Sequence, residues 1–252
     1  MSVDYQLCNG VAWLTINRPH AHNSLNKAVR DGLFDGVRRF NDDDTAKVLV
    51  LTGAGDKAFC AGGDLKEMST AGLAVPPIDF VPQFGRNITV EKPTIAAVNG
   101  VAFAGGFLLA QTCDLCVAST TAKFAITEAK VGRGSPWAVP LPLMIPRRIA
   151  MELVLTGSAL SAARAYEIGF VNRLTEPADL VRVVQDLAEQ IAHNAPLSLS
   201  AGKRTAVLTA EFPLSEAFDR AEAIWEPVYR SADAQEGMRA FVDKRAPVWK
   251  GI

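Results

Sequence analysis

The sequence predicts an α/β fold in which stacked β-β-α units are followed by a helical C-terminal part. Two segments, 48–68 and 94–111, share one plan: a buried strand, a turn, a glycine-rich bend and then a helix. Their residue identities do not repeat, so the predicted repeat is structural. Beyond Val139 the apolar pattern becomes mostly helical. A doubly wound sheet is the alternative that this pattern allows.

Strands are predicted from alternation and from short apolar runs. Residues 48–52 and 94–98 are continuous apolar runs, as expected for strands buried on both faces. Asn9-Gly10 separates two alternating segments and indicates a hairpin, because a type I′ turn needs positive φ at both central residues. The predicted strands are 3–7, 11–16, 48–52, 94–98, 114–118 and 123–127.

Helices are predicted where apolar residues recur on one face, as they do in 26–41. Gly169 follows such a segment and is suited to a left-handed helix cap. The glycine- and proline-rich segments 53–63 and 72–82 are predicted to be loops. The predicted helices are 26–41, one from about 106, 162–168, 178–193, 214–231 and 234–244.

Composition restricts the class of protein. The chain has 252 residues, 49% of them hydrophobic, which is enough for one large core with a helical appendage. A net charge of -1, from 26 basic and 27 acidic residues, argues against a nucleic-acid partner. No apolar run reaches the ~18 residues of a membrane span, and no signal peptide follows Met1. We therefore expect a cytoplasmic protein without a membrane partner.

The cysteines indicate neither a disulfide scaffold nor a metal site. There are 4 in the chain, and Cys113 and Cys116 form a C-x-x-C pair. No second pair of Cys or His ligands completes a zinc site. We expect buried, unreactive thiols and no bound metal.

Two glycine-rich bends carry the first functional signal. Gly62-Gly63 and Gly105-Gly106 each lie between a predicted buried strand and a helix. Glycine leaves the backbone N–H open to a ligand, and the first N–H groups of a helix lack partners and favour negative charge. One such bend is more often only a tight connection. Two of them suggest that one N–H from each meets on a single oxyanion.

A dinucleotide-binding motif is present only in outline. Residues 53–58 read GAGDKA, which fits G-x-G-x-x-A after a strand. That motif must open directly into a helix, whereas 58–63 is predicted to continue as a loop. NAD binding is therefore not expected.

Glu128 is the candidate acid or base. If the strand predicted at 123–127 continues, Glu128 points the same way as Phe124 and Ile126, onto an apolar face. Desolvation there would raise the pKa of the carboxyl group and suit it to act as a base near neutral pH. The alternative is a carboxylate at a strand end that faces solvent or pairs with Lys130.

Several motifs together resemble the enoyl-CoA hydratase/isomerase family, also called the crotonase family, from about residue 11 to residue 249. They are Asn17-Arg18-Pro19 with Asn23-Ser24-Leu25, AFCAGGDLKEM at 58–68, KPTIAAVNG at 92–100 with Ala104-Gly105-Gly106, LTG, AYEIG and VN within 151–172, and Glu236-Gly237 with Ala240-Phe241 and Lys244-Arg245. The resemblance implies a crotonase-like spiral of β-β-α turns, capped by C-terminal helices and assembled as trimers or pairs of trimers.

The resemblance also implies roles for individual residues. Backbone N–H groups of Gly63 and Gly105 match the family's oxyanion hole, in which each donor contributes about 10²–10³ in rate. Glu128 matches one of the two glutamates that the family's hydratases use, and Leu108 stands at the position of the other. A single carboxylate is enough for a 1,3-proton shift. Isomerases of the family resemble this arrangement and often have a proline and a bulky aromatic residue where Pro136-Trp137 stand here.

The nucleotide end of coenzyme A is expected across the first glycine bend, mostly on backbone groups. The matching positions are Ala61, Asp64, Leu65 and Lys66. Further candidates, for the phosphates, are Arg18, His22 and Lys27, with ordinary surface charges as the alternative. In relatives, residues like Phe241 and Lys244 reach the coenzyme A of a neighbouring subunit. The loop 72–82 and residues 136–139, including Pro136 and Trp137, are expected to shape the acyl pocket.

These signals predict an acyl-CoA enzyme that stabilises a thioester enolate and, with one glutamate, isomerises the double bond of an enoyl-CoA. Hydration of a 2-enoyl-CoA and a non-catalytic acyl-CoA-binding role are the alternatives. We expect a spiral core over 1–195 and a helical trimerisation region over 196–252. A homotrimer or hexamer is expected, and no cofactor is expected beyond the coenzyme A of the substrate.

Overall fold

The computed structural model describes residues 2–252, and its strands form two sheets. The larger sheet has the order β1-β2-β3-β5-β7-β10, and the smaller has the order β4-β6-β8-β9. The strands of the larger sheet are β1 (Val3–Cys8), β2 (Val11–Ile16), β3 (Val48–Gly53), β5 (Thr94–Val98), β7 (Leu115–Ser119) and β10 (Arg173–Thr175). Those of the smaller sheet are β4 (Ala58–Cys60), β6 (Val101–Phe103), β8 (Lys123–Ala125) and β9 (Leu160–Ser161).

The chain alternates between the two sheets, which produces the predicted spiral. β3, β5 and β7 are parallel neighbours in the larger sheet, and each is followed directly by β4, β6 or β8 in the smaller one. The first two turns continue into the helices α2 (Leu65–Thr70) and α3 (Gly105–Thr112). A doubly wound fold would place all these parallel strands in one sheet, so the β-β-α prediction is confirmed and its alternative is excluded.

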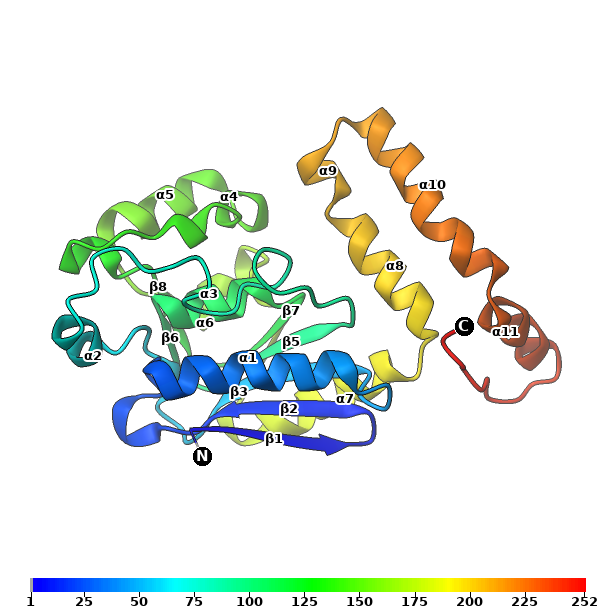
Figure 1. The fold of residues 1–252 in the computed structure, drawn as a ribbon, viewed down its shortest axis with the longest axis horizontal. Helices are drawn as coiled ribbons and strands as arrows, with labels where there is room; N and C mark the ends of the chain where they lie inside the picture. Colours follow the sequence, from blue (N-terminus) through cyan, green and yellow to red (C-terminus); the bar gives the residue numbers. More distant parts are fainter. Residues whose placement is uncertain (1) are drawn as a thin grey trace.

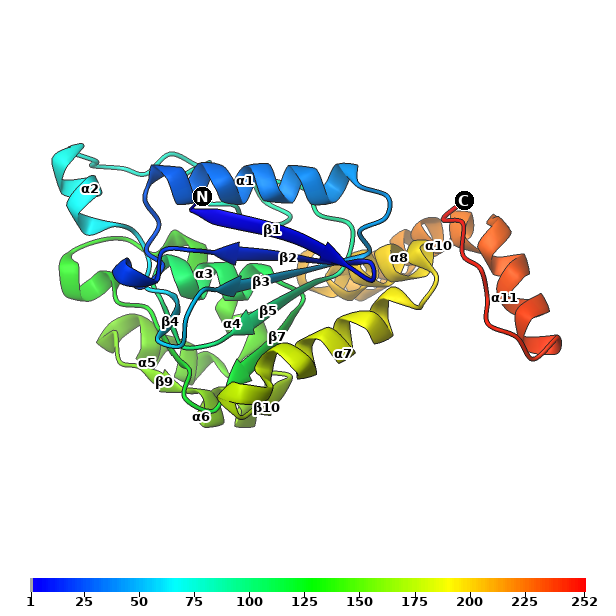
Figure 2. The same ribbon diagram turned by 90° about the horizontal axis from the view of Figure 1, so that it is seen from below.

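Two helices cover opposite faces of the larger sheet, as Figure 2 shows: α1 (Lys27–Asp42) on one face and α7 (Leu180–Ala192) on the other. Val48 and Val50 pack in a cluster with residues of α7, whereas Leu49 and Leu51 pack on the side of α1. Successive side chains of a strand point to opposite faces. Apolar residues on both faces therefore explain why 48–52 is a continuous apolar run.

The remaining helices of the core lie beside the smaller sheet. They are α4 (Leu141–Met144), α5 (Arg147–Thr156) and α6 (Ala162–Glu167). Helix α6 begins directly after β9, the last strand of that sheet. Gly169, just beyond α6, has a φ of +86°, which confirms the predicted left-handed cap. Asn9 and Gly10 have φ values of 51° and 76°, as the predicted type I′ turn requires.

The last four helices stand away from the core in Figure 1. They are α8 (Pro196–Ala206), α9 (Leu208–Glu211), α10 (Leu214–Arg230) and α11 (Ala232–Val242). Lys203 of α8 joins them to the core through an ion pair of 2.9 Å with Asp114. Large apolar side chains, among them Phe218 and Phe241, are exposed on α10 and α11. No helix within residues 2–252 is long and apolar enough to cross a membrane.

Two local predictions were wrong, and within the stretch expected to be mostly helical some helices were not assigned individually. Part of the predicted loop 53–63 is the strand β4, whose three residues are buried and pair with β6. The strand predicted at 123–127 ends at Ala125, and a short 3-10 helix, η2 (Glu128–Val131), begins at Glu128. The helices α5 and α8 were not predicted from the sequence. The strands of the smaller sheet have only two or three residues each, too few to show periodicity.

Candidate active site

The ends of three neighbouring strands surround one cavity of about 500 Å³. The parallel strands β4, β6 and β8 lie side by side, so their carboxyl ends meet at one edge of the smaller sheet. Gly63 follows β4, Gly105 follows β6 and Glu128 follows β8, and all three line the cavity. The spiral therefore brings the three predicted functional segments together at equivalent positions of successive turns.

The two glycine bends are in direct contact. A Cβ atom placed on Gly62 would lie 2.7 Å from the Cβ of Ala104 and 3.4 Å from the backbone nitrogen of Gly105. Gly62 also has a φ of +96°, a conformation that side chains rarely adopt. Only glycine at this position allows the second bend to pack so closely on the first.

The backbone holds the amides of Gly63 and Gly105 without pairing them. On either side of Gly63, the Leu25 N–H donates to the Gly62 carbonyl at 2.8 Å, and the Asp64 N–H donates to the Leu25 carbonyl at 3.4 Å. Gly105 is the first residue of α3, where helix N–H groups have no partner within the helix. Neither amide donates to another group within residues 2–252.

Ala104 orients the second bend through a strained backbone. Its φ of 50° and ψ of -120° lie outside the regions favoured by residues with a side chain. Its N–H donates to the carbonyl of Ala125 at 2.9 Å, which anchors the bend to the end of β8. Strain of this kind persists where the surrounding structure enforces it, and it is concentrated at functional sites.

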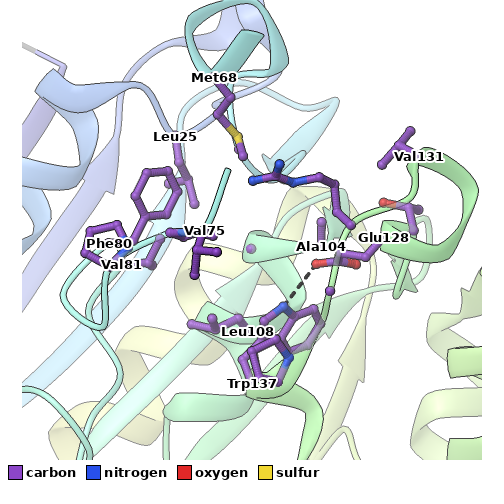
Figure 3. A pocket seen from close by; sticks show the side chains of 18 of the residues that line it. Leu25, Met68, Val75, Phe80, Val81, Ala104, Leu108, Glu128, Val131 and Trp137 are labelled. Atoms are coloured by element: carbon purple, nitrogen blue, oxygen red, sulfur yellow. Dashed lines mark hydrogen bonds between the residues drawn. The ribbon is translucent and has the colours of Figure 1, made fainter. Parts of the chain in front are cut away.

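Glu128 is buried, with 9% of its surface exposed. Figure 3 shows its carboxylate beside Trp137, whose indole Nε1 donates a hydrogen bond of 3.0 Å to Oε1. The other oxygen, Oε2, is buried and has no hydrogen-bond partner within residues 2–252. Burial raises the pKa of Glu128, and hydrogen bonds from its own backbone N–H and from Trp137 offset part of this effect. The predicted burial is correct, although the carboxylate is presented by η2 and not by a continuing strand.

The rest of the cavity wall is mainly apolar. Leu108 of α3 is 6% exposed and lines the cavity with an apolar side chain. Glu128 is the only carboxylate among the lining residues that the structure describes. The predicted contact residues that do line the cavity are Ala61, Leu65, Pro136 and Trp137, joined by parts of the loop 72–82 such as Val75, Phe80 and Val81.

Two of the predicted coenzyme A contacts lie outside the cavity. Asp64 caps α2 by accepting hydrogen bonds from the backbone N–H groups of Lys66 and Glu67 at 3.1 and 3.2 Å. It also forms an ion pair of 2.6 Å with Arg18, and hydrogen bonding to that guanidinium lowers the pKa of Asp64. The side chain of Lys66 is exposed.

The three candidate phosphate ligands have partners in the chain or an outward position. Arg18 pairs with Asp64 and also donates to Ser24 Oγ at 2.8 Å. Lys27 pairs with Asp31 at 2.6 Å on the exposed face of α1. His22 is exposed, and its backbone carbonyl accepts the N–H of Ala61 at 3.0 Å. Arg18 thus connects the N-terminal segment to the first glycine bend, which gives it a structural role.

Two further residues that line the cavity, Arg86 and Arg133, were not predicted from the sequence. The only sequence signal for Arg133 is that a charged residue closely follows Glu128; it lies outside the segments 72–82 and 136–139 that were expected to shape the acyl pocket. Within residues 2–252, no group of three His, Cys, Asp or Glu side chains could hold a metal ion. The expected burial of the thiols holds for Cys60 and Cys116, whereas Cys113 is partly exposed and Cys8 is exposed. Burial raises the pKa of the Cys60 thiol to about 12.

Fold and cavity together define the class of two-sheet α/β spirals that carry their site between successive β-β-α turns. The model of the family described as "Enoyl-CoA hydratase/isomerase" matches residues 6–252. The chain belongs to this family of enzymes.

Individual relatives match this chain over all or nearly all of its length. An (E)-benzylidenesuccinyl-CoA hydratase of Thauera aromatica is 38% identical, with 100% of both proteins covered. A carnitinyl-CoA dehydratase of Salmonella typhi is also 38% identical, with 94% of each covered. The crystal structure of an enoyl-CoA hydratase from Mycobacterium marinum superimposes with a TM-score of 0.88 at 39% identity, covering 100% of this chain and 99% of the other.

Proposed function

We propose that the chain forms the enolate of an enoyl-CoA thioester and moves its double bond by a proton shift that Glu128 carries out. The observation that supports this most is the single buried carboxylate in a cavity that also contains two unpaired backbone amides. A thioester that places its carbonyl oxygen between the amides of Gly63 and Gly105 would expose its α-carbon to the carboxylate.

In the proposed reaction, the ionised Glu128 removes a proton from carbon 2 of a 3-enoyl thioester. The electron pair of that C–H bond moves into a dienolate, and its negative charge resides largely on the thioester oxygen. The two N–H groups stabilise this charge as an oxyanion hole, each contributing about 10²–10³ in rate. The protonated Glu128 then returns the proton to carbon 4, and the double bond lies between carbons 2 and 3.

Oε2 is the oxygen that we assign to proton transfer. Oε1 is held by Trp137, while Oε2 has no partner among the described residues. The raised pKa of the carboxyl group makes Glu128 a stronger base when ionised and brings its titration closer to neutral pH. Coenzyme A enters this reaction as part of the substrate, and the proposal requires no resident cofactor.

Hydration of a 2-enoyl-CoA is the second candidate function. The names of the two curated relatives support it, because one is a hydratase and the other a dehydratase. Leu108 opposes it, because an apolar side chain replaces a carboxylate that would help to position water.

Turnover of matched substrates separates the two candidates. A 3-enoyl thioester that gains conjugated absorbance without uptake of water supports isomerisation. A 2-enoyl thioester that loses this absorbance and gains the mass of water supports hydration. In either case Glu128→Gln should lower turnover by about 10²–10⁴-fold while thioester binding is kept. Full activity of this variant would contradict the proposal, and binding without any turnover by the wild type would indicate a non-catalytic acyl-CoA-binding protein.

We further propose that α8–α11 form a trimerisation region. Exposed apolar surface of this kind on a folded chain commonly marks an interface. Phe241 is 86% exposed, Val242 is 77% exposed and Tyr229 is 73% exposed. A homotrimer, or a hexamer of two trimers, would cover these side chains. Sedimentation of the full chain measures this mass directly.

A further inference from the structure

Arg133 is a charged cavity residue to which the proposed proton shift assigns no role. It borders the main cavity and also an adjoining hollow of about 250 Å³ lined by residues of α2, by Leu73 and by Val131. Its Nη2 is buried and has no hydrogen-bond partner among the residues that the structure describes. Among charged side chains of residues 2–252, only Glu128 has another such buried, unpaired atom.

The chain holds Arg133 in place next to the catalytic segment. Its Nη1 donates to the carbonyl of Leu73 at 2.9 Å, and its backbone N–H donates to the carbonyl of Glu128 at 2.9 Å. Gly132, which ends η2, has a left-handed φ of 65° and turns the chain immediately before Arg133. The guanidinium is thus anchored through Nη1, and Nη2 is left without a partner among residues 2–252.

The charges around the cavity are unbalanced toward positive. Its ionisable lining residues are Arg86, Arg133 and Glu128. Arg86 is exposed and donates to the side chain of Gln83 at 2.8 Å, and the two arginines outnumber the one carboxylate. Arg133 as a whole is partly buried, but a buried N–H donor of a charged group that is left without a partner, as at Nη2, is costly. A bound anion would remove this cost at Arg133.

We propose that Arg133 is a specificity residue that binds a carboxylate on the acyl chain of the substrate. This inference rests on the proposed function, because it assumes that the acyl group of a thioester occupies the main cavity. The planar guanidinium matches the geometry of a carboxylate, and hydrogen bonds between two charged partners are stronger than those between neutral ones. The substrate class would be monothioesters of dicarboxylic acids.

Equilibrium binding tests this inference separately from catalysis. The probes are glutaryl-CoA and its terminal amide, and adipyl-CoA and its terminal amide, each titrated into the full chain by calorimetry. Each pair shares the coenzyme A group and the chain length and differs only in the terminal charge. We expect the carboxylate of at least one pair to bind about 10- to 100-fold more tightly than its amide. Equal binding in both pairs would overturn the inference.

Two variants assign the preference to Arg133. Arg133→Met should abolish the preference for the carboxylate and leave amide binding nearly unchanged. Lys130→Met is the matched control, because it removes an exposed positive charge from η2, the short helix that precedes Arg133, and it should keep the preference. A similar loss for carboxylate and amide in Arg133→Met would mean that Arg133 binds coenzyme A phosphates or only supports the loop at Leu73, and would refute the inference. If the wild type prefers the carboxylate over the amide but turns over no enoyl thioester, the result would count against the proposed function alone.

Discussion

The hydrogen bond from Trp137 to Glu128 offers the most direct test of how the cavity controls the ionisation of Glu128, the proposed base. Trp137→Phe removes the indole N–H and keeps an aromatic ring against Phe107, whose centroid lies 6.2 Å from that of Trp137. The variant therefore leaves the carboxylate buried and removes the side-chain donor to Oε1. The cavity keeps most of its apolar wall.

The size of the effect follows from the nature of the bond. A hydrogen bond to a charged group contributes about 1.5–3 kcal/mol, and this bond is 3.0 Å long at a side chain that is 9% exposed. Because Trp137 lowers the pKa of Glu128, its removal should raise that pKa further. Only the ionised form is a base, so kcat/KM should fall about 10- to 100-fold at acidic to neutral pH. The loss should be smaller at alkaline pH, where the carboxyl group ionises again.

The assay is the pH profile of kcat/KM for the variant and the wild type. Trp13→Phe is a suitable control, because it removes an indole hydrogen bond of 2.7 Å to Gln185 at a site outside the cavity. It should leave the profile unchanged. A Trp137→Phe profile with an unchanged acidic limb would refute the view that this bond sets the ionisation of Glu128.

Three further predictions concern stability and assembly. Glu128→Gln should stabilise the fold at neutral pH, because burial penalises the ionised carboxylate of the wild type. The thermal midpoints of variant and wild type should converge below the pKa of an unfolded glutamate, where the carboxyl group is protonated in both states. A gain in stability that does not depend on pH would contradict this. Gly106→Ala places a Cβ 1.9 Å from the Cys60 carbonyl and should cost about 3 kcal/mol in urea unfolding, whereas the control Gly202→Ala, with no atom nearer than 4.0 Å, should be neutral or stabilising. Phe241→Asp should reduce the sedimenting mass if α11 lies in an interface, and an unchanged mass would argue against the proposed trimerisation region.

Long elements with a clear period were predictable from the sequence. The hairpin at Asn9-Gly10, the strand β2 and the helix α1 have the expected bounds to within a residue or two. Each of these is specified locally, by turn chemistry or by an apolar stripe that recurs many times. β4 and β6 were not predicted, because a strand of three residues is too short to show a period and the two strands that pair lie about forty residues apart.

The GAGDKA segment shows how tertiary pairing decides the meaning of a local motif. It resembles a dinucleotide-binding loop, and its rejection rested on the prediction that 58–63 is a loop. The structure instead continues into β4, so the glycines connect two strands of different sheets. A dinucleotide-binding loop opens directly into a helix, whereas this segment leads into a strand, so the reason given for the rejection, a loop over 58–63, was wrong for residues 58–60.

The sequence by itself determined the residue types that the chemistry needs and the local signals around them: glycines that leave amides uncovered, a glutamate in apolar surroundings, and Leu108 where a second carboxylate is absent. Only the tertiary structure decided that these groups share one cavity, because their proximity depends on the parallel pairing of β4, β6 and β8. The contacts of Trp137 and Arg133 were decided in the same way. Side-chain partners and burial depend on the packing of distant segments, and no single stretch of sequence contains that information.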